Sequence, residues 1–333
     1  MSDIVASQVP VRCGVPFARE VSSALVIMIL GALGYFLFPD DLAFLTRLIC
    51  IAFLVLSLDL VTGYCGIATL GQAAQFGVAA YAVGIACVRG LTDPIALLGV
   101  GIVAGTLMGL ISGALIARFR ALPQLVLSIA VGQLVAGLAN KLSWLTGGSD
   151  GLSGITPGKV FGIFGFDMYS RTAFLFSIGV LVVVFVLLQR LVNSPFGLMC
   201  RGIKDDDLRA RMIGVSIYPR LVLMYGIAGA VAGVGGALTA MSTGVVGLDS
   251  VSFERSAEVL VMLVLGGAGH LWGALAGTII FMIFEHIVAA ANPFHWMTLV
   301  GLLLILIVVF APRGLIEPVL SLISRFKHGG SAA

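Results

Sequence analysis

Residues 94–117 read PIALLGVGIVAGTLMGLISGALIA, an apolar run of 24 residues without a charged side chain. A helix needs about 20 such residues to cross the hydrocarbon core of a bilayer, and it satisfies its own backbone hydrogen bonds there. The run therefore predicts a transmembrane helix. Gly101, Gly105, Gly109 and Gly113 recur at every fourth position, on one face of that helix. We expect this face to pack closely against another helix, with pore lining as the alternative.

Nine further apolar segments accompany this run. Of the 333 residues, 59% are hydrophobic and 11% are charged, whereas about a quarter of the residues in a soluble domain are charged. The sequence therefore predicts an all-α polytopic membrane protein with about ten transmembrane helices. The ten segments are residues 21–38, 42–62, 73–90, 94–117, 122–145, 172–190, 221–243, 256–268, 273–290 and 296–312.

These segments form one predicted transmembrane domain, 21–316, between an N-terminal segment (1–20) and a C-terminal tail (317–333). Lys and Arg are more frequent in the cytoplasmic loops of membrane proteins. With a cytoplasmic N-terminus, thirteen of the nineteen Lys and Arg residues fall inside and six outside. This excess predicts that both termini are cytoplasmic, with the long loop 191–220 inside and the polar stretch 146–171 outside.

Composition and spacing argue against several classes of function. The five cysteines form no CxxC pair and the four histidines lack metal-ligand spacing, so we expect no disulfide framework and no metal site. No basic patch with interleaved aromatic residues predicts nucleic-acid binding. The chain also lacks a G-x-x-x-x-G-K-[ST] loop and any catalytic constellation within its helices, so it is predicted to be neither an ATPase nor another enzyme.

Two glycine-rich segments interrupt the apolar pattern, one in each half of the chain. They are GYCGIATLGQ (63–72) and GGAGHLWG (266–273). Broken helices at matching places in two halves point to a transport path, because unwound backbone inside a membrane requires protein or water around it. The alternative is a tight loop between helices at the membrane surface.

Two acidic residues lie within predicted helices. Asp59 is late in the second segment and Glu285 is late in the ninth. An ionisable side chain in lipid is costly, so each is a candidate for a role in the transport path or in helix pairing. The alternative is that each reaches the membrane surface or pairs there.

The loop 191–220 contains DDDLRARMIG, residues 205–214. Acidic residues begin this stretch and Arg209 and Arg211 follow, which suits the dipole of a short helix that Gly214 ends. Asp205 with Arg209, and Asp207 with Arg211, have the spacing of helical ion pairs. Such a helix either docks on a soluble partner or is simply solvated.

Several motifs together resemble one family. They are GYCGIATLGQAA (63–74), LTGGSDGL (145–152), SPFG (194–197), the stretch 201–214, LGGAG (265–269) with WG (272–273), and FAPRGL (310–315). In this order, across about residues 40–316, they are similar to the permease subunit of branched-chain amino acid ABC importers. Gln72 and Gln75 depart from the family pattern, which usually has His and an aromatic residue there.

The resemblance implies roles for three groups of residues. The first group docks on an ATPase: Asp205, Asp206, Asp207, Ala210 and Gly214. The second lines the translocation path: Gly63, Gly66, Thr69, Gly71, Gln72, Gly266, Gly267 and Gly269. The third forms an extracytoplasmic loop: Gly147, Gly148, Asp150 and Gly151.

The resemblance also implies a multi-subunit importer in the bacterial inner membrane. Its other members are a second, homologous permease, two cytoplasmic ATPases that bind ATP and an extracytoplasmic solute-binding protein. This chain itself binds no cofactor, and its other surroundings are lipid. The expected solute is a branched-chain or related amino acid, with urea, amides and aromatic acids as alternatives. The rival interpretation is a stand-alone secondary transporter that uses Asp59 and Glu285.

Overall fold

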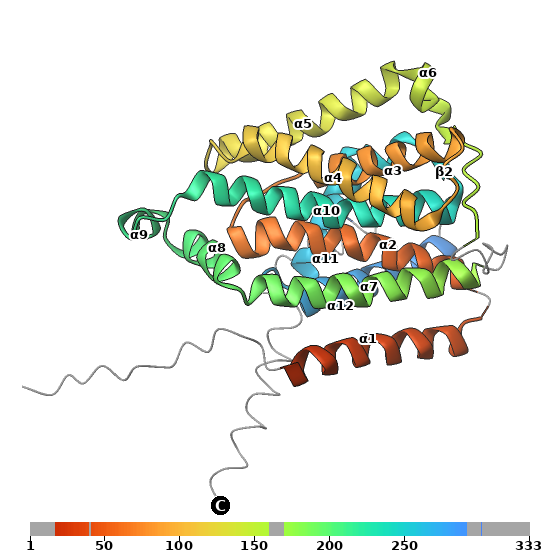
Figure 1. Cartoon of the computed structure of the whole chain (residues 1–333), viewed down its shortest axis with the longest axis horizontal. Coiled ribbons are helices and arrows are strands. Elements are labelled where there is room, and N and C mark those ends of the chain that lie inside the picture. The colour runs from red at the N-terminus through yellow and green to blue at the C-terminus, as the bar shows by residue number, and fades with distance from the viewer. Residues whose placement is uncertain (1–16, 40, 160–169, 292–300, 302–333) are drawn as a thin grey trace, which may run out of the picture.

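A computed structural model of the protein describes residues 17–39, 41–159, 170–291 and 301. Within these residues, helices run roughly side by side in an elongated bundle (Figure 1). The elements in chain order are α1 (Phe17–Leu37), α2 (Leu42–Leu58), the π-helix η1 (Asp59–Tyr64), α3 (Gln72–Val88), α4 (Pro94–Ile116), α5 (Leu122–Lys141), α6 (Ser143–Thr146), the 3-10 turn η2 (Gly148–Asp150), β1 (Leu152–Ser153), α7 (Arg171–Val192), α8 (Pro195–Asp205), α9 (Asp207–Met212), α10 (Ile217–Thr243), β2 (Val245–Val246), the 3-10 turn η3 (Leu248–Val251), α11 (Phe253–Gly266) and α12 (Leu271–Ala291).

Helices cover nine of the ten predicted apolar segments within the described residues, and the tenth, 296–312, lies outside them. In the described part of the chain, six helices are long and apolar enough to cross a membrane: 42–64, 94–116, 122–141, 171–192, 217–243 and 271–289. The apolar parts of α1 and α3 are shorter. The all-α polytopic architecture is confirmed, and the count of about ten transmembrane helices stays a prediction. The tail 317–333 and most of the segment 1–20 lie outside the described residues.

The helices α2 and α10 lie at the centre of the bundle, and most of their residues are buried. The helices α4, α5 and α7 bury one face only and expose large apolar side chains such as Val103, Val126 and Val183. A helix that is apolar on its exposed face as well as its buried face is typical of a membrane span. Figure 1 shows α10 between α4 and α2.

The glycine stripe of α4 faces α10. A Cβ atom on Gly105 would overlap with the carbonyl oxygen of Gly229 and lie 2.8 Å from Cα of Gly233. A Cβ atom on Gly101 would lie 2.9 Å from the carbonyl oxygen of Gly233. Small residues let two backbones touch, and such contact drives helix association in lipid. The packing interpretation of the stripe is therefore confirmed.

The two ends of the bundle differ. At one end, α8 and α9 project beyond the long helices (Figure 1). At the other end, β1 pairs with β2 in an antiparallel ladder that joins Leu152 to Val246 and Ser153 to Val245. We call these the α9 end and the sheet end.

Candidate functional site

The first glycine-rich segment begins where α2 changes into a π-helix. The helix α2 ends at Leu58 and the π-turn runs from Asp59 to Tyr64, followed by an irregular loop up to α3. Gly66 has a φ of +72°, and Thr62 Oγ1 donates a 2.9 Å hydrogen bond to the carbonyl oxygen of Ile67. Single π-turns are rare and are common at functional sites. The sequence predicted the interruption but not its π-helical form.

The second glycine-rich segment is a tight turn between two helices. The helix α11 ends at Gly266 and α12 begins at Leu271. Gly267 and Gly269 have φ values of +95° and +94°, which L-residues with side chains rarely adopt. A Cβ atom on Gly266 would overlap with the carbonyl oxygen of Gly273, so the two helices touch at the turn. Of the two interpretations offered for this segment, its local form matches the tight loop.

The two breaks meet at the α9 end. The backbone N–H of Gly269 donates a 2.6 Å hydrogen bond to Oδ1 of Asp59, which is 0% exposed. Nζ of Lys204, on α8, donates a 2.7 Å hydrogen bond to the carbonyl oxygen of Gly63. A Cβ atom on Gly63 would overlap with Asp59 Oδ1 and lie 2.5 Å from the Gly269 nitrogen. We call Asp59, Gly63, Lys204 and Gly269 the Asp59 junction.

A second contact holds α8 against the same π-turn. The guanidinium of Arg201 lies over the ring of Tyr64, with its carbon 4.9 Å from the ring centroid. A guanidinium over an aromatic face is attracted by the ring quadrupole. A Cβ atom on Gly66 would lie 2.8 Å from Cγ of Lys204, so the loop after the π-turn also packs on α8.

A chain of hydrogen bonds surrounds Gln72, one of the predicted path residues. Gln72 Nε2 donates to Ser57 Oγ at 3.1 Å and to Gln75 Oε1 at 3.0 Å. Gln75 Nε2 donates in turn to Ser112 Oγ at 3.1 Å. The chain thus connects α2, α3 and α4, and Gln72 is only 1% exposed. In this conformation Gln72 lies inside the packed chain, where its amide helps to hold three helices together.

Two other predicted path residues lie against α5 and α10. Thr69 is buried, and its side chain interacts with that of Tyr225 on α10. A Cβ atom on Gly71 would lie 2.6 Å from the carbonyl oxygen of Ser128, and Ser128 Oγ accepts a 3.0 Å hydrogen bond from the Leu70 N–H. The loop between the π-turn and α3 therefore contacts α5, α8 and α10 at once.

The predicted helix 205–214 is divided in the structure. Asp205 ends α8, Asp206 has an extended backbone, and α9 runs from Asp207 to Met212. Asp206 caps α9, because its Oδ1 accepts a 3.1 Å hydrogen bond from the Arg209 N–H. Gly214 follows with a φ of +83°, as predicted for the residue that ends the helix. The prediction of one continuous helix was therefore wrong, because the cap needs Asp206 outside the helix.

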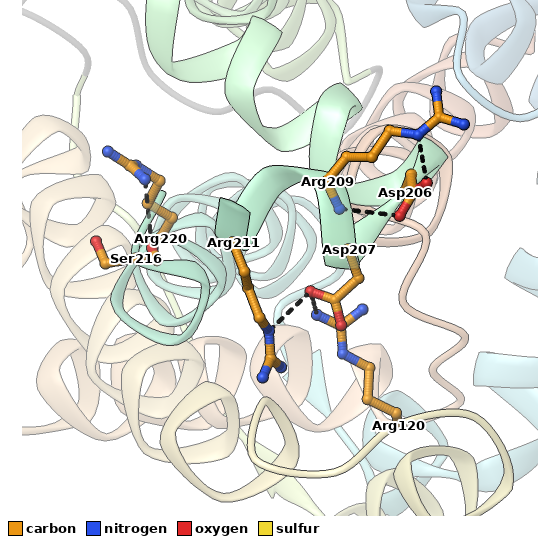
Figure 2. A network of polar contacts seen from close by, with 7 residues as sticks. All are labelled: Arg120, Asp206, Asp207, Arg209, Arg211, Ser216 and Arg220. Atoms are coloured by element: carbon orange, nitrogen blue, oxygen red, sulfur yellow. Dashed lines mark hydrogen bonds and ion pairs between the residues drawn. The ribbon is translucent and has the colours of Figure 1, made fainter. Parts of the chain in front are cut away.

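One of the two ion pairs predicted for residues 205–211 forms. Arg211 Nε lies 3.4 Å from Asp207 Oδ1, as the spacing predicted. Arg209 does not pair with Asp205 as predicted, because its Nε lies 2.8 Å from Oδ2 of the capping Asp206. Figure 2 shows that Asp207 also binds Arg120, whose Nη2 is 2.8 Å from Oδ1 and which precedes α5. The Arg120 pair connects α9 to the bundle.

Apolar side chains are exposed on α9 and at the residue that follows it. Leu208 is 67% exposed, Met212 is 83% exposed and Ile213 is 80% exposed, whereas Ala210 is buried against the bundle. We call Leu208, Met212 and Ile213 the α9 apolar patch. Exposed apolar side chains grouped beside charged ones are typical of a surface that binds another protein.

The predicted extracytoplasmic loop lies at the sheet end, opposite α9 (Figure 1). Gly147, Gly148 and Gly151 have φ values of +78°, +61° and +74°, and Asp150 is exposed at the end of η2. A Cβ atom on Gly147 would overlap with the carbonyl oxygen of Gly151. The glycines allow this tight turn, which continues into β1 and so is joined to β2.

The two intramembrane acids do not lie together. Asp59 binds the turn that precedes α12, whereas Glu285 lies fourteen residues after Leu271, about 21 Å along that helix. Glu285 interacts electrostatically with Arg255 and Glu258 at the sheet end. The structure therefore places the two carboxylates at opposite ends of the bundle.

Sequence reasoning missed the roles of Lys204 and Arg201, which it counted only as positive charges in a loop. Lys204 contacts a residue 141 positions away, and no local pattern signals such a contact. Ser57 and Ser112 were also missed. A serine in an apolar helix usually bonds to its own backbone, so its presence does not predict a contact with a side chain of another helix.

Comparison with known proteins settles the family. The sequence profile of a family described as the permease component of branched-chain amino acid transport systems matches residues 42–309. The chain belongs to this family. The matched part of the permease runs from α2 onward and includes both breaks, the Asp59 junction, the polar chain around Gln72 and α9. Members of this family are transport subunits and not enzymes.

Individual relatives agree with this assignment. The high-affinity branched-chain amino acid transport system permease protein LivM of Escherichia coli is 28% identical to the permease over 300 residues, which cover 83% of this chain and 69% of LivM. LivM of Salmonella typhimurium is 27% identical over the same shares of the two chains. The fructose import permease protein FrcC of Rhizobium meliloti is 24% identical over 62% of this chain and 60% of FrcC. No solved structure matches the permease.

Proposed function

We propose that this permease is one membrane-spanning half of an ATP-driven ABC importer that carries small polar solutes across a bacterial inner membrane. Branched-chain amino acids are the first candidates, because both LivM relatives are named for them. Urea, amides and aromatic acids are the alternative solutes. FrcC, named for fructose, supports the idea that related permeases serve different solutes.

The exposed position of α9 is the observation that carries this proposal. Its apolar patch projects from the bundle at a place where no residue of the described chain covers it. Arg120 holds α9 to the bundle through Asp207, and α8 continues from α9 to the Asp59 junction. A docked ATPase that moves α9 would therefore move groups that contact both helix breaks. ATP would be bound and hydrolysed on that partner, while this chain supplies the docking residues Asp205, Asp206, Asp207, Ala210 and Gly214.

The charge distribution supports a cytoplasmic α9 end. Five basic residues, Arg201, Lys204, Arg209, Arg211 and Arg220, belong to α8, α9 or the start of α10. Cytoplasmic loops carry an excess of Lys and Arg, so this end faces the cytoplasm in the proposed orientation. Both termini are then cytoplasmic.

The sheet end would face the solute-binding protein. The loop of Gly147, Gly148, Asp150 and Gly151 continues into β1, which pairs with β2. This pairing holds the loop in a fixed position. A second, homologous permease would complete the path. In that view the glycines of the two breaks let the path open and close from the α9 end.

The rival interpretation as a stand-alone transporter gains no support from the acids. Asp59 and Glu285 lie at opposite ends of the bundle, so they do not form one ion site. Asp59 is also engaged by the Gly269 N–H.

Reconstitution tests the proposal. The permease, its partner permease and the ATPases are placed in liposomes with the binding protein, and uptake of radiolabelled leucine is measured with and without ATP. Met212→Glu puts a charge into the α9 apolar patch and is expected to reduce ATPase binding about tenfold or more, because a buried unpaired charge is costly. Ser149→Glu, which adds the same charge at the sheet end, is the matched control and keeps normal ATPase binding.

Two results would contradict the proposal. Uptake by the permease alone, without ATP or partners, would establish a secondary transporter. Equal ATPase binding by the Met212→Glu and wild-type proteins would place the ATPase elsewhere on the surface.

A further inference from the structure

The Asp59 junction joins segments that are far apart in the chain. The hydrogen bond from the Gly269 N–H to Asp59 spans 210 residues, and the bond from Lys204 to Gly63 spans 141. Both acceptors belong to the π-turn that ends α2. The turn 267–270, the π-turn and α8 are therefore connected within one small cluster.

Packing alone does not explain a carboxylate at this place. Asp59 is fully buried, and its second oxygen, Oδ2, has no hydrogen-bond partner among the described residues. An apolar side chain of similar size would fill the same volume without the cost of burying a charge, and such replacements of buried charges are often neutral or stabilising. Asp59 therefore costs stability, which is typical of a residue with another role.

The charge of Asp59 depends on α8. The positive charges that act on it come from Lys204 and Arg201, which are three residues apart and lie on the same face of α8. Both cations belong to α8, which leads directly into α9. Withdrawal of α8 therefore removes the charges that offset the burial of Asp59. The position of α8 and the Asp59–Gly269 hydrogen bond are then energetically coupled.

We propose that Asp59 is a positioning residue that transmits movement of α8 and α9 to the turn between α11 and α12. This inference rests on the proposed function, in which an ATPase moves α9. When α8 holds Lys204 and Arg201 near the π-turn, Asp59 keeps its hydrogen bond to Gly269. The π-turn and the turn 267–270 then stay in contact. When α8 moves away, the bond weakens and the turn 267–270 is released.

Hydrogen–deuterium exchange on the full complex tests this coupling. Exchange in α9 and in residues 266–271 is followed with and without a non-hydrolysable ATP analogue. In the wild-type complex both regions are expected to respond. In Asp59→Leu, α9 still responds, whereas the response of 266–271 and the number of solute molecules carried per ATP each fall about tenfold, within the usual range of coupling between sites.

Further variants separate the role of Asp59 from folding. Lys204→Met removes the cation from the partly exposed side of the junction, and it is expected to lower solute carried per ATP in the same way as Asp59→Leu. Asp59→Asn keeps an oxygen that accepts from Gly269 but lacks the charge on which Lys204 and Arg201 act. It is therefore expected to keep the exchange of 266–271 without the ATP analogue near the wild-type level, and to lose most of the response to the analogue. Glu254→Leu removes an exposed acid from α11 and is the matched control with wild-type values.

The outcomes distinguish the two proposals. If hydrogen–deuterium exchange in α9 of the wild-type complex does not change when the ATP analogue is added, the proposed function is contradicted. An α9 region that responds, with equal responses of 266–271 in the wild-type, Asp59→Leu and Lys204→Met complexes, would overturn the role of Asp59 alone.

Discussion

At Gly63, the absence of a side chain decides whether Asp59 reaches Gly269. Gly63→Ala would place a methyl group on Asp59 Oδ1 and 2.5 Å from the Gly269 nitrogen. We expect a loss of about 1–3 kcal/mol in the free energy of unfolding, because overpacking forces neighbours to move. Thermal unfolding of the purified protein in detergent measures it. Gly202→Ala on α8, which meets no atom within 4 Å, is the control and keeps or raises the melting temperature.

The two glutamines on α3 form a pair whose energy is measurable. Gln72→Leu and Gln75→Leu each remove the hydrogen bond between the two amides, and each also removes a bond to a serine. We expect the double variant to be less destabilised than the sum of the single variants, with a coupling of about 0.6 kcal/mol, typical of side-chain hydrogen bonds in membranes. A double-mutant cycle in detergent gives this value. Strictly additive effects would show that the amides act independently.

Among the elements, α4 and α10 depend on glycine where they touch. Gly105→Ala places a methyl group on the carbonyl oxygen of Gly229, whereas Gly99→Ala on the same helix meets no atom within 4 Å. We expect Gly105→Ala to lower the melting temperature. Gly99→Ala should raise stability by up to about 1 kcal/mol, because alanine favours helix more than glycine does. Equal effects at the two positions would contradict the packing of α4 on α10.

The short helix α9 depends on its cap. Asp206→Ala removes the acceptor for the Arg209 N–H and the ion-pair partner of Arg209. Loss of an N-cap costs about 1 kcal/mol, so we expect faster hydrogen exchange in α9 with little change in the melting temperature of the bundle. Asp206→Ser keeps a capping oxygen and should retain most of the protection. If Asp206→Ala exchanges as slowly as wild type, the pair of Asp207 with Arg120 holds α9 without the cap.

For the whole molecule, the proposed orientation makes a prediction about accessibility. Met212 projects from the α9 end and Ser149 is exposed at the sheet end. In intact cells, a membrane-impermeant maleimide should label Ser149→Cys and leave Met212→Cys unlabelled until the membrane is opened. Cys50, Cys65, Cys87 and Cys200 are buried, and Cys13 is replaced by serine in both variants. The reverse labelling pattern would show that the α9 end faces outward.

Much of this architecture follows from the sequence. The hydrocarbon core requires apolar runs of about 20 residues, so composition and length determined where the helices lie. The spacing of the α4 glycines determined which face packs, because a helix repeats every 3.6 residues. The glycine-rich interruptions and the charged stretch near α9 were also evident, since backbone conformation and helix dipoles are local properties.

Only the tertiary structure decided what these parts contact. The sequence offered Asp59 and Glu285 as two candidate intramembrane acids without their positions relative to one another. The fold places them at opposite ends of the bundle and brings Asp59 to Gly269 and Lys204 to Gly63. The fold also pairs Arg209 with the capping Asp206 rather than with Asp205. Contacts across 141 and 210 residues depend on how whole helices pack, and the short-range preferences of a sequence carry no record of that packing.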